Sequence, residues 1–182
     1  MKKRSRNSSP IYRPVWVEIS HKNLRRNFSE LKSWLSPKTA VLTVVKANAY
    51  GHGLAEVART LSREGARFLG VTSVEESLAL KVAGIHTPSL ILGNIFPFSN
   101  LEHAIKNNIR ITVASLESAL MCEKFAKKLK KKVFAHAKID TGMNRIGVSV
   151  KNALPFIEKI ASLKSVVLEG IYTHFASSYQ GH

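Results

Sequence analysis

The chain has 182 residues, of which 45% are hydrophobic, so it is long and apolar enough to bury a core, and disorder is not expected. No apolar stretch approaches the length of a membrane span, and no apolar run follows the basic start of the chain, which excludes a secretory signal. The single cysteine, Cys122, excludes an internal disulfide framework and favours the cytoplasm.

The charge is strongly basic, with 28 Lys and Arg residues against 12 Asp and Glu residues and a net charge of +16. The basic residues cluster in segments 1–13 and 124–132. Such clusters bind nucleic acid or anionic membranes, or they form a solvated tail and a solvated helix end. We favour the second interpretation, because neither a nucleic-acid motif nor aromatic interleaving accompanies the charge. A third possibility is that further sequence carries balancing acids.

The first 13 residues are predicted to form a disordered basic tail, and 14–182 to form one domain. A short extended segment is expected at 15–19, followed by a helix with Ser20 as N-cap and Leu24, Phe28, Leu31 and Leu35 on one face. The pairs Ser73–Glu76 and Ser99–Glu102 have the spacing of capping boxes. Ser115 and Ser149 are expected to open later helices. Strands are predicted at 41–46, 68–71, 89–93, 109–113, 133–139 and 166–173.

Strands separated by helical segments indicate parallel βαβ units, which build either a doubly wound sheet or a (β/α)8 barrel. Candidate functional residues follow several different strands, as on the catalytic face of a barrel, and the sequence has no GxGxxG fingerprint. We therefore expect an α/β fold of the (β/α)8 TIM type, incomplete here, with about six of its eight strand–helix units.

The segment 40–53, AVLTVVKANAYGHG, is the most informative part of the chain. An apolar strand ends on Lys46, and a turn with Gly51 and Gly53 leads into a helix. Burial penalises the charged form of a lysine, and a neutral amine forms Schiff bases with aldehydes such as that of pyridoxal 5'-phosphate (PLP). On spacing alone, a lysine that reaches solvent from a strand end is the better explanation.

Two later blocks, KIDTGMNRIG at 138–147 and GIYTHFA at 170–176, add to this segment. Together, and in this order, the three blocks resemble alanine racemases, the fold-type III PLP enzymes. The resemblance implies a TIM-type barrel and a homodimeric, cytoplasmic isomerase that interconverts L- and D-alanine for peptidoglycan. It also implies that the chain corresponds to roughly the N-terminal half of such an enzyme, without its C-terminal β-domain.

The resemblance also implies roles for individual residues. Lys46 would form the Schiff base with PLP and exchange a proton with the substrate. Tyr50 would contact the cofactor phosphate, and His174 would lie against the cofactor ring. Arg145 would hydrogen-bond the phenolic oxygen of PLP and help to place the substrate carboxylate. Without the resemblance, Tyr50 and His174 are also explained as packing residues.

Lys138 matches a lysine that is carbamylated in many members of the family. A charged lysine paired with Asp140 is the alternative, and both interpretations stay open. Asn144 stands where the family usually has glycine, and asparagine tolerates positive φ. Met121, Cys122 and Phe125 are expected in the core. No group of residues has the spacing of metal ligands.

Three functions are therefore considered. The first is a truncated alanine racemase with little or no activity alone, because the family's second base, a tyrosine from the partner subunit, lies in the other half. The second is a single-domain PLP carrier, which the racemase blocks argue against. The third is a basic module for nucleic acid or membranes, which salt-dependent binding without a PLP spectrum would support.

Overall fold

The computed structural model describes residues 15–177, so the predicted tail at 1–13 lies outside the described residues. A parallel sheet of seven strands runs in the order β1-β2-β3-β4-β5, and both β6 and β7 pair with β5. The strands are β1 (Leu42–Val44), β2 (Phe68–Val71), β3 (Ser89–Ile91), β4 (Arg110–Val113), β5 (Val133–Asp140), β6 (Val148–Ser149) and β7 (Val166–Tyr172). Apart from the two-residue β6, these are the six predicted strands.

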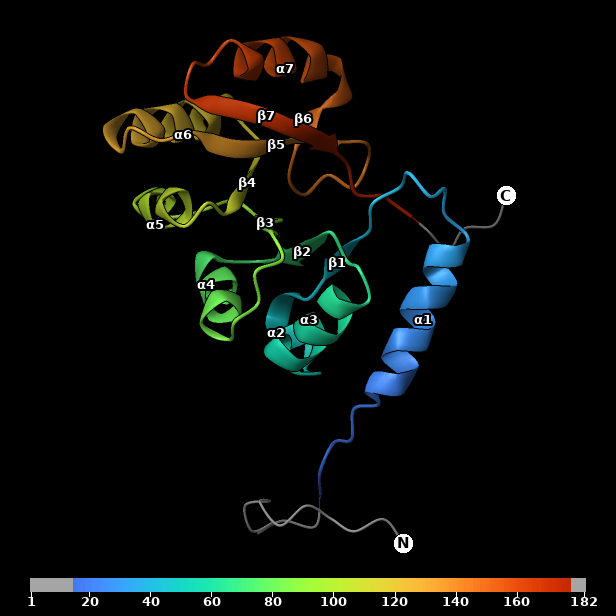
Figure 1. Cartoon of the computed structure of the whole chain (residues 1–182). Coiled ribbons are helices and arrows are strands. Elements are labelled where there is room, and N and C mark those ends of the chain that lie inside the picture. The colour runs from blue at the N-terminus through green and yellow to red at the C-terminus, as the bar shows by residue number, and fades with distance from the viewer. Residues whose placement is uncertain (1–14, 178–182) are drawn as a thin grey trace, which may run out of the picture.

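The helices follow the strands along the chain, as βαβ units require. They are α1 (His21–Ser33), α2 (Lys46–Tyr50), α3 (Leu54–Arg63), α4 (Val74–Val82), α5 (Asn100–Lys106), α6 (Leu116–Lys128) and α7 (Ala153–Ala161), with a 3-10 turn at Val150–Asn152 before α7. The sheet curves into an arc, and α4 to α7 cover its outer side (Figure 1). This architecture confirms the predicted α/β fold with a parallel sheet.

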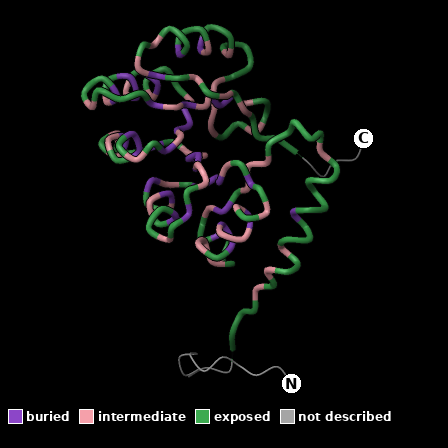
Figure 2. Tube along the Cα trace, viewed as in Figure 1, coloured by how far each residue is buried: buried purple, intermediate pink, exposed green. Residues whose placement is uncertain are grey.

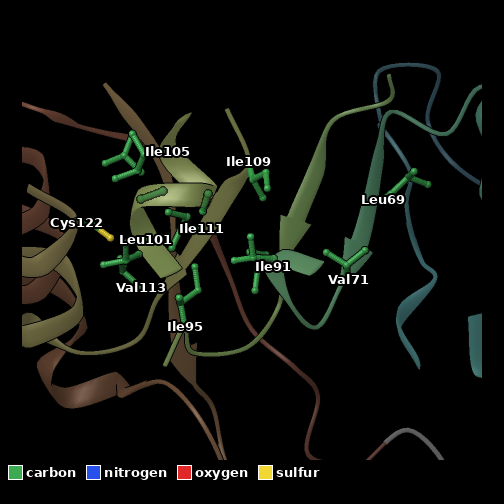
Figure 3. Packing of buried hydrophobic residues seen from close by; sticks show 14 of the residues in the cluster. Leu69, Val71, Ile91, Ile95, Leu101, Ile105, Ile109, Ile111, Val113 and Cys122 are labelled. Carbon is green, nitrogen blue, oxygen red and sulfur yellow. The ribbon is translucent and has the colours of Figure 1, made fainter. Parts of the chain in front are cut away.

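The core lies between the sheet and these outer helices (Figure 2). Leu69 and Val71 of β2, together with Ile91 and Ile111 of the next two strands, are buried against the helix layer (Figure 3). Cys122 of α6 is 1% exposed, and burial raises the pKa of its thiol to about 12. Met121 and Phe125 are partly buried against the same cluster, so the expected core position of all three residues is confirmed.

The helix starts were predicted with mixed success. Ser20 and Ser115 cap their helices, the latter in a capping box with Ser118. Ser99 was wrongly predicted to cap α5, because its φ of −56° is already helical and its side chain accepts no capping bond. The first N–H groups of this helix donate instead to backbone carbonyls of residues 97–99. Ser149 stands at the N-cap position of the 3-10 turn that leads into α7, but its side chain makes no capping bond.

The segment before α1 packs little against the rest of the chain. Residues 15–19 lie in no strand among the described residues, and Val15 and Val17 are each 80% exposed. On the predicted apolar face of α1 only Phe28 is buried, while Leu31 is 47% exposed. Within residues 15–177, no helix is long and apolar enough to cross a membrane.

Candidate functional site

Lys46 follows β1 and begins an unusual turn. The N–H of Val45 donates to the carbonyl of Gly70 in β2 over 2.8 Å, which fixes the chain just before Lys46. Residues 47–50 then have φ values of 52–54°, so this part of α2 is a left-handed turn. A left-handed conformation costs roughly 1–2 kcal/mol for each residue that carries a Cβ. Because none of these four residues is glycine, other contacts must hold the turn.

Backbone bonds within the turn and the bond from the Leu54 N–H to the Asn48 side chain supply part of these contacts. Glu76 of α4 supplies those from outside the turn, and it was not among the predicted site residues. Its Oε1 accepts hydrogen bonds from the backbone N–H of Ala47 over 2.6 Å and of Asn48 over 3.4 Å. Its Oε2 accepts from the N–H of Thr72 over 2.8 Å. The predicted capping box of α4 is therefore half correct. Ser73 does accept from the N–H of Glu76, but the Glu76 carboxylate reaches other backbone donors.

The loop after β5 carries Arg145 and is organised by Asp140. Its Oδ1 accepts from the backbone N–H of Gly142 over 2.9 Å and of Asn144 over 3.1 Å, and these bonds hold the pKa of the Asp140 carboxyl below its usual value. Asn144 has a φ of 56°, as the sequence predicted for this turn. At Gly147 a Cβ would lie 2.7 Å from the Asp140 nitrogen, so only glycine fits there.

The structure brings all five predicted site residues to the rim and walls of one cavity of about 370 Å³. They come from the ends of three strands: β1 supplies Lys46 and Tyr50, β5 supplies Lys138 and Arg145, and β7 supplies His174. Leucine and valine side chains form the apolar part of the lining, and no carboxylate is among the lining residues. A second cavity of about 440 Å³ lies between α1 and α3, and of the five residues only Tyr50 reaches it.

Lys138 is the buried cation of the cavity, with 4% of its surface exposed. Burial lowers the pKa of its ammonium group, the positive charges of Arg145 and Lys46 lower it further, and Asp140 opposes the shift. Its Nζ lies 5.6 Å from the ring centre of Tyr172. Among residues 15–177 no carboxylate lies within 4.0 Å of this ammonium group, so the considered ion pair with Asp140 is not formed.

Two polar residues that line the cavity, Tyr172 and His136, were not predicted from the sequence. The hydroxyl of Tyr172 donates to the carbonyl of Leu92 over 3.3 Å and shares a 2.7 Å hydrogen bond with Thr112. Burial raises the pKa of this phenol. His136 lines the cavity and contacts Glu169 over 3.0 Å. Alternation of polar and apolar residues along β5, which places His136 and Lys138 on one face, is the signal that could have identified this part of the lining.

Glu169 also binds Arg110, so a charged network extends from His136 away from the residues that line the cavity. Two guanidinium nitrogens of Arg110 donate to the Glu169 carboxylate over 3.1 and 3.2 Å. Burial raises the pKa of Glu169, but the hydrogen bonds from Arg110 and His136 outweigh it and leave the pKa below its usual value. Gly170 makes room for this network, since a Cβ there would lie 2.7 Å from the Nδ1 of His136.

The donor set of the cavity fits an anionic, partly aromatic cofactor such as PLP. Three cationic side chains, from Lys46, Lys138 and Arg145, face a space whose volume is within the usual range for small-molecule sites. The aliphatic side chains offer an apolar surface for a ring, and a lysine amine is the group that bonds an aldehyde. Among the described residues, no group of three or more His, Cys, Asp or Glu side chains has the arrangement of a metal site.

Comparisons with known proteins agree with this geometry. Residues 19–182 match the family model described as alanine racemase, N-terminal domain. The alanine racemase of Carboxydothermus hydrogenoformans is 44% identical over 164 residues, which cover 90% of this chain and 44% of that protein.

Solved structures are similar as well. The alanine racemase of Clostridium difficile 630 in complex with cycloserine superposes with a TM-score of 0.87 at 40% identity, covering 92% of this chain and 46% of that one. The enzyme of Bacillus anthracis with bound L-Ala-P gives a TM-score of 0.83 at 33% identity, covering 92% and 43%. The chain spans less than half the length of these relatives. By sequence and by fold it belongs to the alanine racemase family, a family of PLP-dependent isomerases, and corresponds to their N-terminal domain.

Proposed function

We propose that this chain is the cofactor-binding part of an alanine racemase, in which Lys46 holds PLP covalently and exchanges a proton with the Cα of alanine. One observation carries the proposal. The cavity gathers Lys46, Tyr50, Lys138, Arg145 and His174 from the ends of three strands. Functional groups from several strand ends converge in this way on the catalytic face of TIM-type barrels.

Each residue has a role that follows from its chemistry. PLP, when bound, supplies the electron sink that acidifies the substrate Cα proton. The amine of Lys46 would take that proton on one face of the carbon and return it. The planar fork of Arg145 would hold the phenolic oxygen of the cofactor and orient the substrate carboxylate. The hydroxyl of Tyr50 would hold the phosphate, and the imidazole of His174 would support the cofactor ring.

Lys138 is proposed to be carbamylated, as in many members of the family. Burial favours the neutral amine that must attack carbon dioxide, and the resulting carbamate would orient the nearby Arg145 guanidinium. A carbon-13 NMR spectrum in labelled bicarbonate should show one slowly exchanging carbamate signal that Lys138→Met abolishes. A spectrum unchanged by this substitution would contradict the assignment.

Racemisation needs a second base on the opposite face of the substrate Cα. The family resemblance assigns that base to a tyrosine of the partner subunit in a homodimer, from the half of the enzyme that this chain does not match. We therefore expect the purified 182-residue chain to racemise alanine very weakly or not at all. Conversion of L-alanine at a rate typical of enzymes, measured by chiral chromatography, would contradict this expectation. The complete enzyme would supply D-alanine for peptidoglycan in the cytoplasm.

Trapping of the cofactor tests the proposal directly. The chain is mixed with PLP, reduced with borohydride, digested and mapped by mass spectrometry. A single adduct on Lys46 is expected, and Lys46→Ala should abolish it. Lys124→Ala, which removes an exposed lysine far along the chain in α6, is the matched control and should leave the adduct unchanged. Adducts scattered over many lysines, or none, would contradict the proposed function.

A further inference from the structure

We propose that Glu76 is a positioning residue for Lys46, because its carboxylate holds the left-handed turn that directs Lys46 towards the cavity. This inference rests on the proposed function, since it concerns how the cofactor lysine is presented. Glu76 itself does not line the cavity. Its effect would be transmitted through the backbone of α2, which lies next to α4 in the structure (Figure 1).

The carboxylate of Glu76 links the ends of two neighbouring strands. Thr72, whose N–H donates to Oε2, directly follows β2. Ala47, whose N–H donates to Oε1, lies three residues beyond the end of β1. Because β1 and β2 pair in parallel, their carboxyl ends lie side by side, and one carboxylate can bind backbone donors from both. Hydrogen bonds to an ionised acceptor are about twice as strong as neutral ones.

Lys46 sits between two anchored peptide groups. On its N-terminal side, the N–H of Val45 donates to the carbonyl of Gly70 in the sheet. On its C-terminal side, the Ala47 N–H donates to Glu76 over 2.6 Å. Loss of the Glu76 carboxylate would leave the first anchor intact and release the second. The released residues carry Cβ atoms and prefer negative φ, so only the bonds within the turn, such as that from the Ala49 N–H to the Val45 carbonyl, would oppose a change of conformation. The Lys46 side chain would then lose part of its fixed direction.

A general stabilising effect of a negative charge at the start of α4 is the competing explanation. Glu75 separates the two explanations, because it occupies the same first helical turn and is exposed. Its carboxylate is engaged locally, and hydrogen bonds from its own backbone N–H and from Ser73 lower its pKa. Glu75→Gln therefore removes the same charge from the same helix terminus without changing a contact to the turn at Lys46.

The test compares Glu76→Gln with Glu75→Gln in the full 182-residue chain. PLP is added, samples are quenched with borohydride over time, and the adduct at Lys46 is quantified by mass spectrometry. Glu76→Gln should form this adduct about tenfold more slowly than wild type, with a larger share on other lysines, whereas Glu75→Gln should match wild type. Hydrogen exchange without PLP should show faster exchange over 44–53 in Glu76→Gln only.

A second substitution tests the mechanism. Ala47 is exposed, and glycine adopts positive φ without a Cβ penalty, so Ala47→Gly should restore most of the adduct rate in the Glu76→Gln background. If Glu76→Gln does not unfold cooperatively, Glu76→Asp replaces it, with slowed adduct formation again expected because the shorter side chain cannot span both strand ends.

The outcomes separate the two proposals. Equal rates for Glu76→Gln and Glu75→Gln, with a wild-type adduct on Lys46, would overturn the role of Glu76 and leave the proposed function standing. A loss that Ala47→Gly does not restore would likewise overturn the positioning role. Absence of the Lys46 adduct in wild type would overturn both.

Discussion

Two loops present two of the three cationic residues of the cavity, Lys46 and Arg145, and their backbones with positive φ are stabilised in different ways. The turn at Lys46 and the loop at Arg145 both contain residues with positive φ, and both use a carboxylate that accepts backbone N–H groups. In the Arg145 loop the carboxylate, Asp140, lies two and four residues before its donors. In the Lys46 turn it comes from Glu76, 28 and 29 residues away.

This difference shows how local and non-local control of a loop differ. The Arg145 loop carries its own acceptor together with Gly142 and Gly147, so its conformation is encoded in consecutive residues. The Lys46 turn has non-glycine residues in the left-handed region, and its acceptor arrives only when α4 packs beside it. We infer that the Lys46 turn forms together with the β1–β2 pairing, whereas the Arg145 loop is organised once its own segment is in place.

The largest loss of stability is expected from a substitution of Gly147 in the Arg145 loop. Gly147→Ala would place a Cβ 2.7 Å from the Asp140 nitrogen and 3.0 Å from the carbonyl carbon of Ile139, at a φ of 137°. Steric conflict with backbone atoms cannot be relieved by a rotamer change, so the free energy of unfolding should fall by about 3 kcal/mol in urea titrations.

Gly51→Ala in the Lys46 turn is the matched control for that substitution. Gly51 also has positive φ, at 86°, but a Cβ there would meet nothing within 4 Å. Only the conformational cost remains, so a loss of about 1 kcal/mol is expected. Equal losses at the two glycines would show that the close packing of Gly147 carries no extra energy.

The next largest losses of stability are expected when the two carboxylates, Glu76 and Asp140, are removed. Glu76→Ala leaves three backbone donors at two strand ends without their acceptor, and we expect a loss of about 2 kcal/mol in the free energy of unfolding. Asp140→Ala should cost less, because it removes the acceptor of two donors that lie in the same loop rather than of three donors at two strand ends. The order of the two losses, measured by urea denaturation at pH 7, is the result that matters. A larger loss for Asp140→Ala would contradict the distinction between the loops.

A third effect concerns Lys138, which connects the two regions electrostatically. In the chain whose Lys138 is not carbamylated, burial and the charges of Arg145 and Lys46 lower the pKa of its ammonium group in the folded state. At this group the unfolded chain binds more protons than the folded chain at pH values between the folded pKa and 10.5, so Lys138 contributes a rise in stability with pH in that alkaline range. Lys81, whose pKa is also lowered, contributes in the same direction, and Cys122 and Tyr172, whose pKa values are raised by burial, contribute in the opposite one. Lys138→Met should remove this rise and stabilise the chain at pH 7 by about 1 kcal/mol.

Denaturation curves between pH 7 and 11 would measure the effect of Lys138. Lys124→Met is the control, because Lys124 is exposed on α6 and should alter neither the slope nor the stability. A wild-type slope that Lys138→Met leaves unchanged would mean that another group is responsible.

The distinction between contacts within one segment and contacts between distant segments explains what the sequence could and could not predict. The alternation of apolar strands with helices predicted the parallel sheet, because each segment records its own periodicity. Ser99 has the spacing of a cap but does not act as one, since the preceding carbonyls already satisfy the first donors of α5. The burial of the apolar face of α1 was overestimated, because a helical pattern does not reveal whether another element covers that face. Leu31 is 47% exposed among the described residues.

The cavity shows the same limit. The blocks at Lys46, Lys138 and His174 identified its rim from local motifs, and the structure places these residues together. Glu76 and the network of Arg110, His136 and Glu169 were missed, because their contacts join residues 28 to 59 positions apart. Only the pairing of strands brings such residues together, and a single sequence contains no direct record of that pairing.

The smallest effect is expected at Asn144, a residue with a Cβ that holds a positive φ in the Arg145 loop. Asn144→Gly would relieve the cost of a φ of 56°, but it would remove the 3.3 Å bond from the Asn144 side-chain amide to the Gly142 carbonyl and add freedom to the unfolded chain. These terms oppose one another, so the free energy of unfolding should change by less than about 0.5 kcal/mol. Asn144→Ala, which loses the bond and keeps the Cβ, should cost about 1 kcal/mol. If Asn144→Gly were as damaging as Asn144→Ala, the side-chain bond rather than the tolerance of positive φ would be holding this loop.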